Sequence, residues 1–119
     1  MQIKTEKFCV NYDNTTATIT FEGKIFLNGS QEYAPLLQLL KHAAAQEIQA
    51  QKKLIVDFRH LKLLNSSGIT MMTKFIMYIF EEECLELEIT FVGQKAITWH
   101  QKLLENISML QSAVVIQLE

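Results

Sequence analysis

The chain has 119 residues, so we expect residues 1–119 to form a single domain. The composition is 49% hydrophobic and 20% charged, with one proline and four glycines, which excludes extended disorder. The net charge of -2 gives no electrostatic basis for binding nucleic acid or an anionic membrane.

The two cysteines, Cys9 and Cys84, stand far apart in the sequence and have no histidine nearby that would complete a zinc site. We therefore expect both thiols to be reduced, and we expect no metal or cofactor. The N-terminus lacks the apolar stretch of a signal peptide, and no run reaches the roughly 18 apolar residues of a membrane span. The sequence thus predicts a cytoplasmic protein that does not enter a membrane.

The first predicted elements are two strands. Apolar and polar side chains alternate over residues 7–12 and again over residues 16–22. Asp13 and Asn14 supply turn chemistry between the two runs, which predicts an antiparallel hairpin. Gly23 ends the second run.

A helix is predicted after the sequence Asn28-Gly29-Ser30. Its apolar residues fall near helical spacing: Tyr33, Leu36, Leu37, Leu40, Ala44 and Ile48. Ser30 is the expected N-cap. Pro35 fits only near the first turn, where few amides have helical partners, so the start of this helix is left open.

Residues 54–58 form a short apolar run without alternation, which is typical of a strand covered on both faces. We expect a loop over residues 60–64. Asn65-Ser66-Ser67-Gly68 then opens a strongly apolar helix, whose predicted core stripe is Ile69, Met72, Phe75, Ile76, Ile79 and Phe80.

Residues 86–91 alternate and predict a fourth strand, residues 97–107 a third helix, and residues 113–118 a last strand. The expected order is β-β-α-β-α-β-α-β. Crossovers between parallel strands are right-handed, so this order predicts an α/β fold with a mixed, mostly parallel sheet.

The serine turn is the strongest local motif. A serine at the start of a helix lies among unpaired backbone amides, at the positive end of the helix dipole, where a phosphate is well tolerated. A phosphoserine there adds roughly 1.5 to 2 negative charges. Taken alone, the four residues favour a plainer interpretation, in which Asn65 or Ser66 simply caps the helix.

The sequence around the serine turn favours a functional role for it. The stretch over residues 54–76, LIVDFRHLKLLNSSGITMMTKFI, resembles the signature of STAS domains, the family of anti-sigma-factor antagonists. In that family a hydrophobic strand ending in an acidic residue leads through a short loop to D-S-S/T-G. The NSSGI form resembles a bacterial STAS-like subgroup, and the order of elements also resembles the STAS fold, a mixed β-sheet with helices.

The resemblance implies a partner switch. A serine kinase that is also the anti-sigma factor phosphorylates the antagonist, and a PP2C-type phosphatase reverses the modification. Carried over, the phosphoacceptor is Ser66, with Ser67 the less favoured choice, and Gly68 is the glycine that lets the chain turn into the helix.

Two residues depart from the family pattern. Asn65 stands where the family usually has aspartate, and Phe26 replaces the acidic residue of a G-x-L-D motif. Because charge complementarity discriminates between partners, these changes predict an altered choice of partner.

We therefore expect a non-enzymatic regulator with this partner-binding set: Asn28, Gly29, Ser30, Asn65, Ser67, Gly68 and Ile69. A ligand-sensing STAS-like module and a scaffold that binds without modification remain alternatives. The free edge of the opening hairpin could pair two copies into a homodimer.

Overall fold

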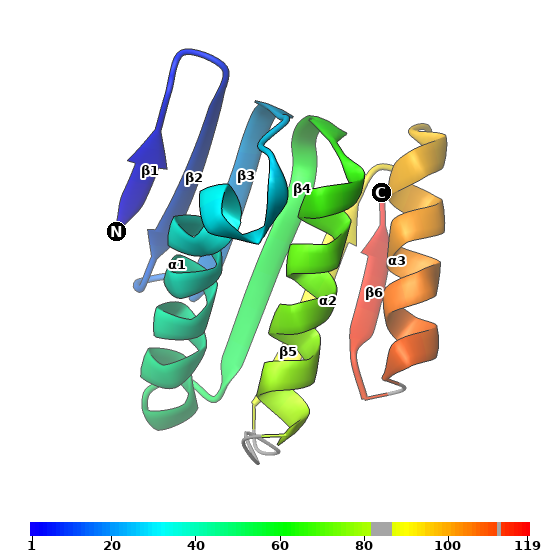
Figure 1. Cartoon of the computed structure of the whole chain (residues 1–119). Helices are drawn as coiled ribbons and strands as arrows, with labels where there is room; N and C mark the ends of the chain where they lie inside the picture. Colours follow the sequence, from blue (N-terminus) through cyan, green and yellow to red (C-terminus); the bar gives the residue numbers. More distant parts are fainter. Residues whose placement is uncertain (82–86, 112) are drawn as a thin grey trace.

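The computed structural model describes residues 1–81, 87–111 and 113–119. The prediction of a reduced Cys84 lies outside the described residues. Six strands form one sheet, and three helices accompany it (Figure 1). The elements are β1 (Gln2–Lys4), β2 (Phe8–Asp13), β3 (Thr18–Ile25), α1 (Gly29–Gln49), β4 (Lys53–Leu64), α2 (Ser66–Glu81), β5 (Glu88–Gly93), α3 (Thr98–Leu110) and β6 (Val115–Leu118).

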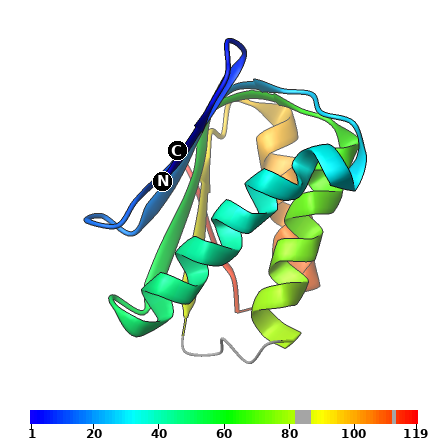
Figure 2. The ribbon, with the colours of Figure 1, turned by 60° about the vertical axis from the view of Figure 1, so that its left-hand side comes forward.

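The strands lie in the sheet in chain order. β1, β2 and β3 are antiparallel, and β3 to β6 are parallel. Right-handed crossovers that always advance in one direction leave every helix on the same face of the sheet. Figure 2 shows α1, α2 and α3 on one side of the sheet, and the apolar core lies between the two layers. The predicted α/β class and mixed sheet are confirmed.

One strand was not predicted. β1 pairs with β2, with Ile3 opposite Val10, and the amide of Tyr12 donates to the carbonyl of Met1 at 2.8 Å. A strand of three residues is too short to display an alternating pattern. It forms by pairing with the backbone of its neighbour. The true order therefore begins with three strands, and β1 rather than β2 forms the edge of the sheet on this side.

The predicted loop over residues 60–64 is wrong, because β4 continues to Leu64. Its pairing with β3 shifts register twice, between Thr20 and Glu22 and between Gly23 and Lys24, and each shift leaves one extra residue on β4. Such bulges break the alternation of side chains and so hide a strand from sequence patterns.

The expectation that this strand is covered on both faces is also wrong. Leu54, Val56 and Phe58 are fully buried in the core beneath the helices, whereas Asp57 and Arg59 follow the alternation onto the face without helices. Asp57 is only 6% exposed there. Nη2 of Arg59 donates to its Oδ2 at 2.9 Å, and Nη1 of Arg59 donates to Glu119 at 2.8 Å, which ties the end of the chain to β4.

The contact between Asp57 and Arg59 predicts an acid-sensitive contribution to stability. Burial alone would raise the pKa of Asp57, but the hydrogen bonds and charge of Arg59 outweigh it and hold the pKa below its ordinary value. The unfolded chain, with a carboxyl pKa of about 3.9, then binds a proton before the folded chain does. The contribution is therefore present above about pH 4 and is lost as the pH falls through the lower pKa of the folded state.

We expect Asp57→Asn to lower the free energy of unfolding at pH 7 and to differ less from the parent chain below about pH 4. Urea unfolding at a series of pH values measures both quantities. A difference that stays constant down to pH 3 would show that the Asp57 carboxylate contributes nothing through its charge.

Candidate functional site

The serine motif opens a helix, as predicted. α2 begins at Ser66, directly after Asn65 at the end of β4. Ser66 is exposed, Ser67 is half-buried and Gly68 is buried. The parallel pairing of β3 with β4 sets Ile25 beside Leu64, so the chain leaving β3 passes next to the start of α2.

Asn65 is the helix cap. Its Oδ1 accepts a hydrogen bond from the amide of Gly68 at 3.1 Å, and its Nδ2 donates to the carbonyl of Leu27 at 2.7 Å. The capping interpretation therefore applies to Asn65 and not to Ser66. The Ser66 hydroxyl makes no side-chain hydrogen bond with any residue that the structure describes.

Tyr33, from α1, completes a small network around Asn65. Its hydroxyl donates to Oδ1 of Asn65 at 2.5 Å and accepts from the amide of Leu27 at 3.4 Å. Burial raises the pKa of Tyr33, although the hydrogen bond from Leu27 opposes the rise. The hydroxyl is therefore protonated at neutral pH, and it links α1 to Leu27, shortly after β3, and to Asn65, directly before α2.

The network explains why position 65 is asparagine here. The amide accepts from Gly68 and donates to Leu27 at once, whereas an ionised carboxylate can only accept. We expect Asn65→Asp to lower the free energy of unfolding by about 1 to 3 kcal/mol, because a carboxylate would face the Leu27 carbonyl. The favourable effect of a negative charge at a helix start, about 0.3 to 1 kcal/mol, is smaller.

Urea unfolding of Asn65→Asp and of Asn65→Ser measures this effect. Serine caps helices as well as asparagine does, so it tests the loss of the Leu27 contact without adding a charge. If Asn65→Asp proves more stable than the parent chain, the network is not what selects asparagine.

Ser67 and the start of α1 are joined. The amide of Gly29 donates to the Ser67 hydroxyl at 3.3 Å. The prediction that Ser30 is the N-cap of α1 is wrong. The helix already begins at Gly29, and Asn28 holds the N-cap position. The amide of Asn28 is instead bound by the Glu32 carboxylate at 2.9 Å. The Ser67 hydroxyl is thus half-buried and accepts a hydrogen bond from Gly29, whereas Ser66 is exposed.

Gly68 has a different role from the one that the resemblance implied. Its backbone has no positive φ, so the turn does not require glycine. A Cβ added at Gly68 would lie 2.3 Å from Cδ1 of Leu64 and 2.8 Å from the Tyr33 hydroxyl. The glycine is required because α2 packs so closely on β4 and α1.

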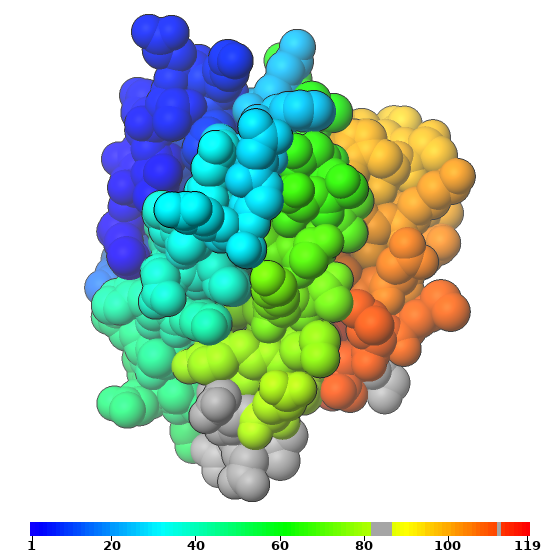
Figure 3. Space-filling model, viewed as in Figure 1, coloured from blue at the N-terminus to red at the C-terminus, as the bar shows by residue number. Residues whose placement is uncertain are grey.

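A pocket of about 200 Å³ lies between the starts of α1 and α2. Gly29, Ser30 and Ser67 line it together with Tyr33 and Lys74. Figure 3 shows the start of α1, in cyan, against the start of α2, in green. The structure thus brings together the two segments that the sequence placed in one surface, residues 28–30 and 65–69.

Three neighbouring apolar residues were not assigned to this surface. Phe26 is 65% exposed and precedes Leu27, which contacts Asn65. Leu63 and Trp99 line a hollow together with the predicted Ile69. The signal for Leu63 was hidden by the bulges in β4, because they obscure which side chains face outward.

Histidines do not form part of the site. His60 lies opposite Glu22 within the sheet, six residues before Ser66, which is about 20 Å along an extended strand. His100 is buried, accepts from the Gln94 amide at 3.1 Å and lies 2.7 Å from the Leu61 carbonyl. Within the described ranges, no group of three or more metal-binding side chains occurs, and no helix is long and apolar enough to cross a membrane.

Comparisons with known proteins identify the fold. No family model matches the sequence, and no curated protein matches it. Apo-SiaC from Pseudomonas aeruginosa superposes with a TM-score of 0.73 at 14% identity, over 100% of this chain and 98% of that chain. A chain in the crystal structure of diguanylate cyclase SiaD with its activator SiaC, from the same organism, gives 0.70 at 17% identity, over 100% and 99%.

An anti-sigma factor antagonist from Mycobacterium paratuberculosis gives a TM-score of 0.57 at 14% identity, over 98% of this chain and 82% of that chain. The expected STAS-like fold is confirmed by these structures. At such identities the similarity establishes the fold, and the function has to be argued from the site.

Proposed function

We propose that the chain is a bacterial signalling regulator that binds a protein partner around the start of α2 and is controlled by phosphorylation of Ser66. The observation that carries the proposal is the state of the Ser66 hydroxyl. It is exposed at the first position of a helix that Asn65 already caps, and it makes no side-chain hydrogen bond with the described residues. Modifying it would therefore change the surface without disturbing the fold.

The surroundings of Ser66 suit a protein partner. Ile69, one turn along α2, is 40% exposed, and the 200 Å³ pocket adjoins Ser67 on the other side. A partner that covers this surface removes it from water. A phosphate on Ser66 would then have to be desolvated without a matching cation, which opposes binding.

The likeness to an activator, SiaC, and to an anti-sigma factor antagonist supports the proposal of a regulator that works by binding. The resemblance of the motif adds the enzymes that we propose would act on it, a serine kinase resembling an anti-sigma factor and a PP2C-type phosphatase.

A ligand-sensing module is the weaker alternative. The pocket beside Ser67 measures about 200 Å³, and sites for drug-sized ligands occupy roughly 300 to 1,000 Å³. Thermal unfolding in the presence of nucleotides and inorganic phosphate tests this alternative, because a ligand of the folded state raises the midpoint temperature. We expect no shift with either.

Mutation of Ser66 distinguishes the proposed switch from a scaffold that binds its partner without modification. The chain carrying Ser66→Ala or Ser66→Asp is expressed with an affinity tag in the source cells, and the partner retained by each variant is quantified by mass spectrometry. We expect Ser66→Ala to retain the partner and Ser66→Asp to lose it. Equal retention would favour the scaffold.

A further inference from the structure

The last strand of the sheet, β6, leaves backbone groups free along its outer edge. It pairs with β5, and no other strand among the described residues lies beyond it. Directly after β6, the amide of Glu119 donates to the Gly93 carbonyl at 3.0 Å, and the Glu119 carbonyl accepts from the amide of Lys95 at 2.8 Å. Backbone groups point to alternate sides along a strand. The N–H and C=O groups of Ile116 and Leu118 therefore point away from β5.

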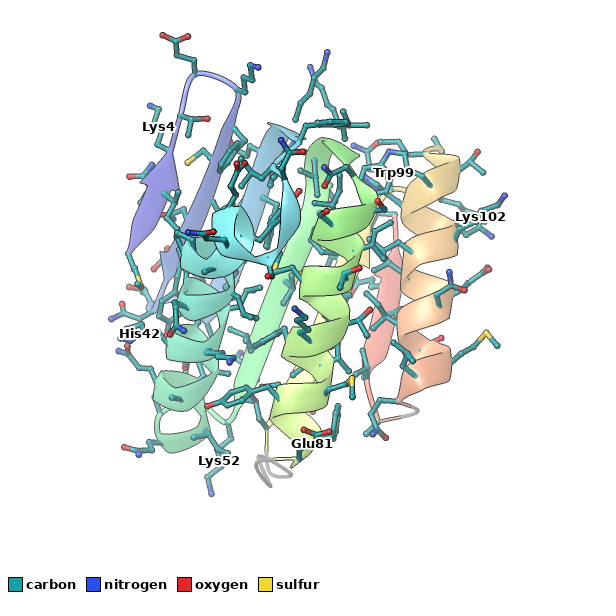
Figure 4. The ribbon with its side chains drawn as sticks, viewed as in Figure 1. Lys4, His42, Lys52, Glu81, Trp99 and Lys102 are labelled. Atoms are coloured by element: carbon teal, nitrogen blue, oxygen red, sulfur yellow. The ribbon has the colours of Figure 1, made fainter. Side chains whose placement is uncertain are left out.

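The sequence of β6 does not protect this edge. Proteins commonly protect free edges with very short strands, lysines, prolines or bulges. β6 has the sequence VIQL, with no lysine or proline, and it pairs with β5 without a register shift. The opposite edge differs, because β1 has only three residues and carries Lys4, which lies across the molecule from β6 (Figure 4). β6 is therefore the edge that favours pairing with another strand.

Apolar side chains accompany the free backbone groups. Ile116 and Leu118 pack against the core but are only half-buried at the edge of the sheet. On the face without helices, Val115 is 46% exposed and Gln117 is exposed. A strand added at this edge would remove apolar surface from water as well as satisfy the backbone.

We infer that β6 pairs antiparallel with β6 of a second copy of this chain, so that the two sheets join across a two-fold axis at Gln117. In this register Ile116 of each copy lies opposite Leu118 of the other, and every backbone group that β6 leaves free finds a partner. In the neighbouring registers only Ile116 or only Leu118 would be paired. The inference goes beyond the proposed function and does not depend on it.

The same register avoids charge repulsion and helix overlap. The two uncharged Gln117 side chains face each other at the axis, and Val115 faces Glu119 of the second copy, so no like charges stand opposite one another. α3 contacts both β5 and β6, which places its axis between them. The α3 helices of the two copies would then be about 10 Å apart, two strand spacings, which is an ordinary distance for packed helices.

Pairing through β6 leaves the candidate site free. Asn65 and Ser66 follow β4, and β5 separates β4 from β6. Each copy in the pair therefore keeps its own surface around the start of α2.

Sedimentation velocity of the full chain over a range of concentrations tests the inference. A short strand pair buries less than the roughly 1,000 Å² of a stable interface, so we expect monomer at about 10 µM and a growing fraction of dimer towards about 1 mM. A chain that stays monomeric throughout would overturn the inference and leave this edge to a strand of another protein.

Charge at the axis tests the register. We expect Gln117→Lys to weaken dimerisation by about tenfold or more, since it sets two like charges opposite each other and each 1.4 kcal/mol is about tenfold. Val115→Lys is the matched control on the same strand and face, because it faces Glu119 and not a second lysine. Lys4→Glu is the control for the β1 edge. We expect both controls to dimerise at least as well as the parent chain.

Mixing two variants provides a second measurement. Gln117→Lys and Gln117→Glu each place like charges at the axis, but together they place opposite charges there, so we expect the mixture to dimerise more than either variant alone. The substituted residues are exposed, and urea unfolding checks that each variant folds as the parent chain does.

Three results with these variants would overturn the inference: a dimer that tolerates Gln117→Lys, a dimer that Val115→Lys disrupts equally, or a dimer that is lost with Lys4→Glu and therefore forms through β1. Its failure is distinct from that of the proposed function. Ser66→Asp reports on release of the partner and the β6 variants report on pairing of two copies, so either result can stand without the other.

Discussion

Replacing Ser66 by aspartate is expected to weaken binding of the native partner by about a hundredfold or more, and phosphorylation is expected to weaken it further. Burying this charge in an interface without a matching cation costs several kcal/mol, and each 1.4 kcal/mol corresponds to about tenfold in affinity. Phosphate carries roughly 1.5 to 2 charges against one for aspartate, and it is larger. Isothermal titration calorimetry with the purified partner gives the affinity of each form.

Ser66→Asn is the matched control, because asparagine has nearly the size of aspartate and no charge. If bulk alone mattered, the two variants would lose affinity equally. We expect Ser66→Asn to stay within about tenfold of the parent chain, since a single exposed polar substitution rarely costs more than 1.4 kcal/mol. Equal affinity for all three chains would contradict control through charge at this position.

Gly68→Val is expected to lower the free energy of unfolding by about 3 kcal/mol, which is the largest effect on folding that we expect in this chain. The new Cβ would lie 2.3 Å from Cδ1 of Leu64, which is buried, and would press on the Tyr33 hydroxyl that holds Asn65. Valine is also stiff at χ1 within a helix, so it has few ways to move aside.

Gly68→Ala separates the clash from ordinary helix propensity. In an open helix this substitution adds about 1 kcal/mol of stability, whereas overpacking costs about 1 to 3 kcal/mol. We expect a net loss in urea unfolding. Ser66→Ala, two residues away and exposed, is the control and should stay within about 0.5 kcal/mol of the parent chain. A Gly68→Ala chain more stable than the parent would show that α2 can move away from Leu64.

The sequence predicted well those elements that display their period. The alternation of β2 and β3, most of the apolar stripe of α2 and the strand-helix order led to the α/β sheet and the STAS-like fold. Ile69 was wrongly predicted in that stripe, because it is 40% exposed. It failed where backbone geometry decides the outcome. The three residues of β1 exist only because β2 offers them a partner, and two bulges hid the end of β4.

The buried polar contacts also could not be predicted from the sequence. Glu47 is fully buried in α1, where it accepts a hydrogen bond from the Tyr12 hydroxyl, and a sequence pattern assigns such a residue to the surface. Burial first, and then the contact with Glu47, raise the pKa of Tyr12, so the hydroxyl remains the donor. The pairing depends on the meeting of β2 and α1, which no local pattern encodes.

The candidate site was predicted in part for the same reason. The loop over residues 28–30 does lie beside Ser67, whereas the role of Ser66 stays a prediction. The network of Leu27, Tyr33 and Asn65 was not predicted, because it joins three elements through side chains. The hydrogen bonds of that network use the Asn65 amide, so asparagine at this position has a structural role beyond the loss of the family's usual charge.

The proposed switch is tested most directly by the modification state of the native chain. The endogenous protein is separated by size into partner-bound and free fractions, and phosphorylation is mapped in each by mass spectrometry. We predict a phosphate on Ser66 in the free fraction and an unmodified Ser66 in the partner-bound fraction. Equal phosphorylation of Ser66 in both fractions, or an unmodified Ser66 throughout, would contradict the account.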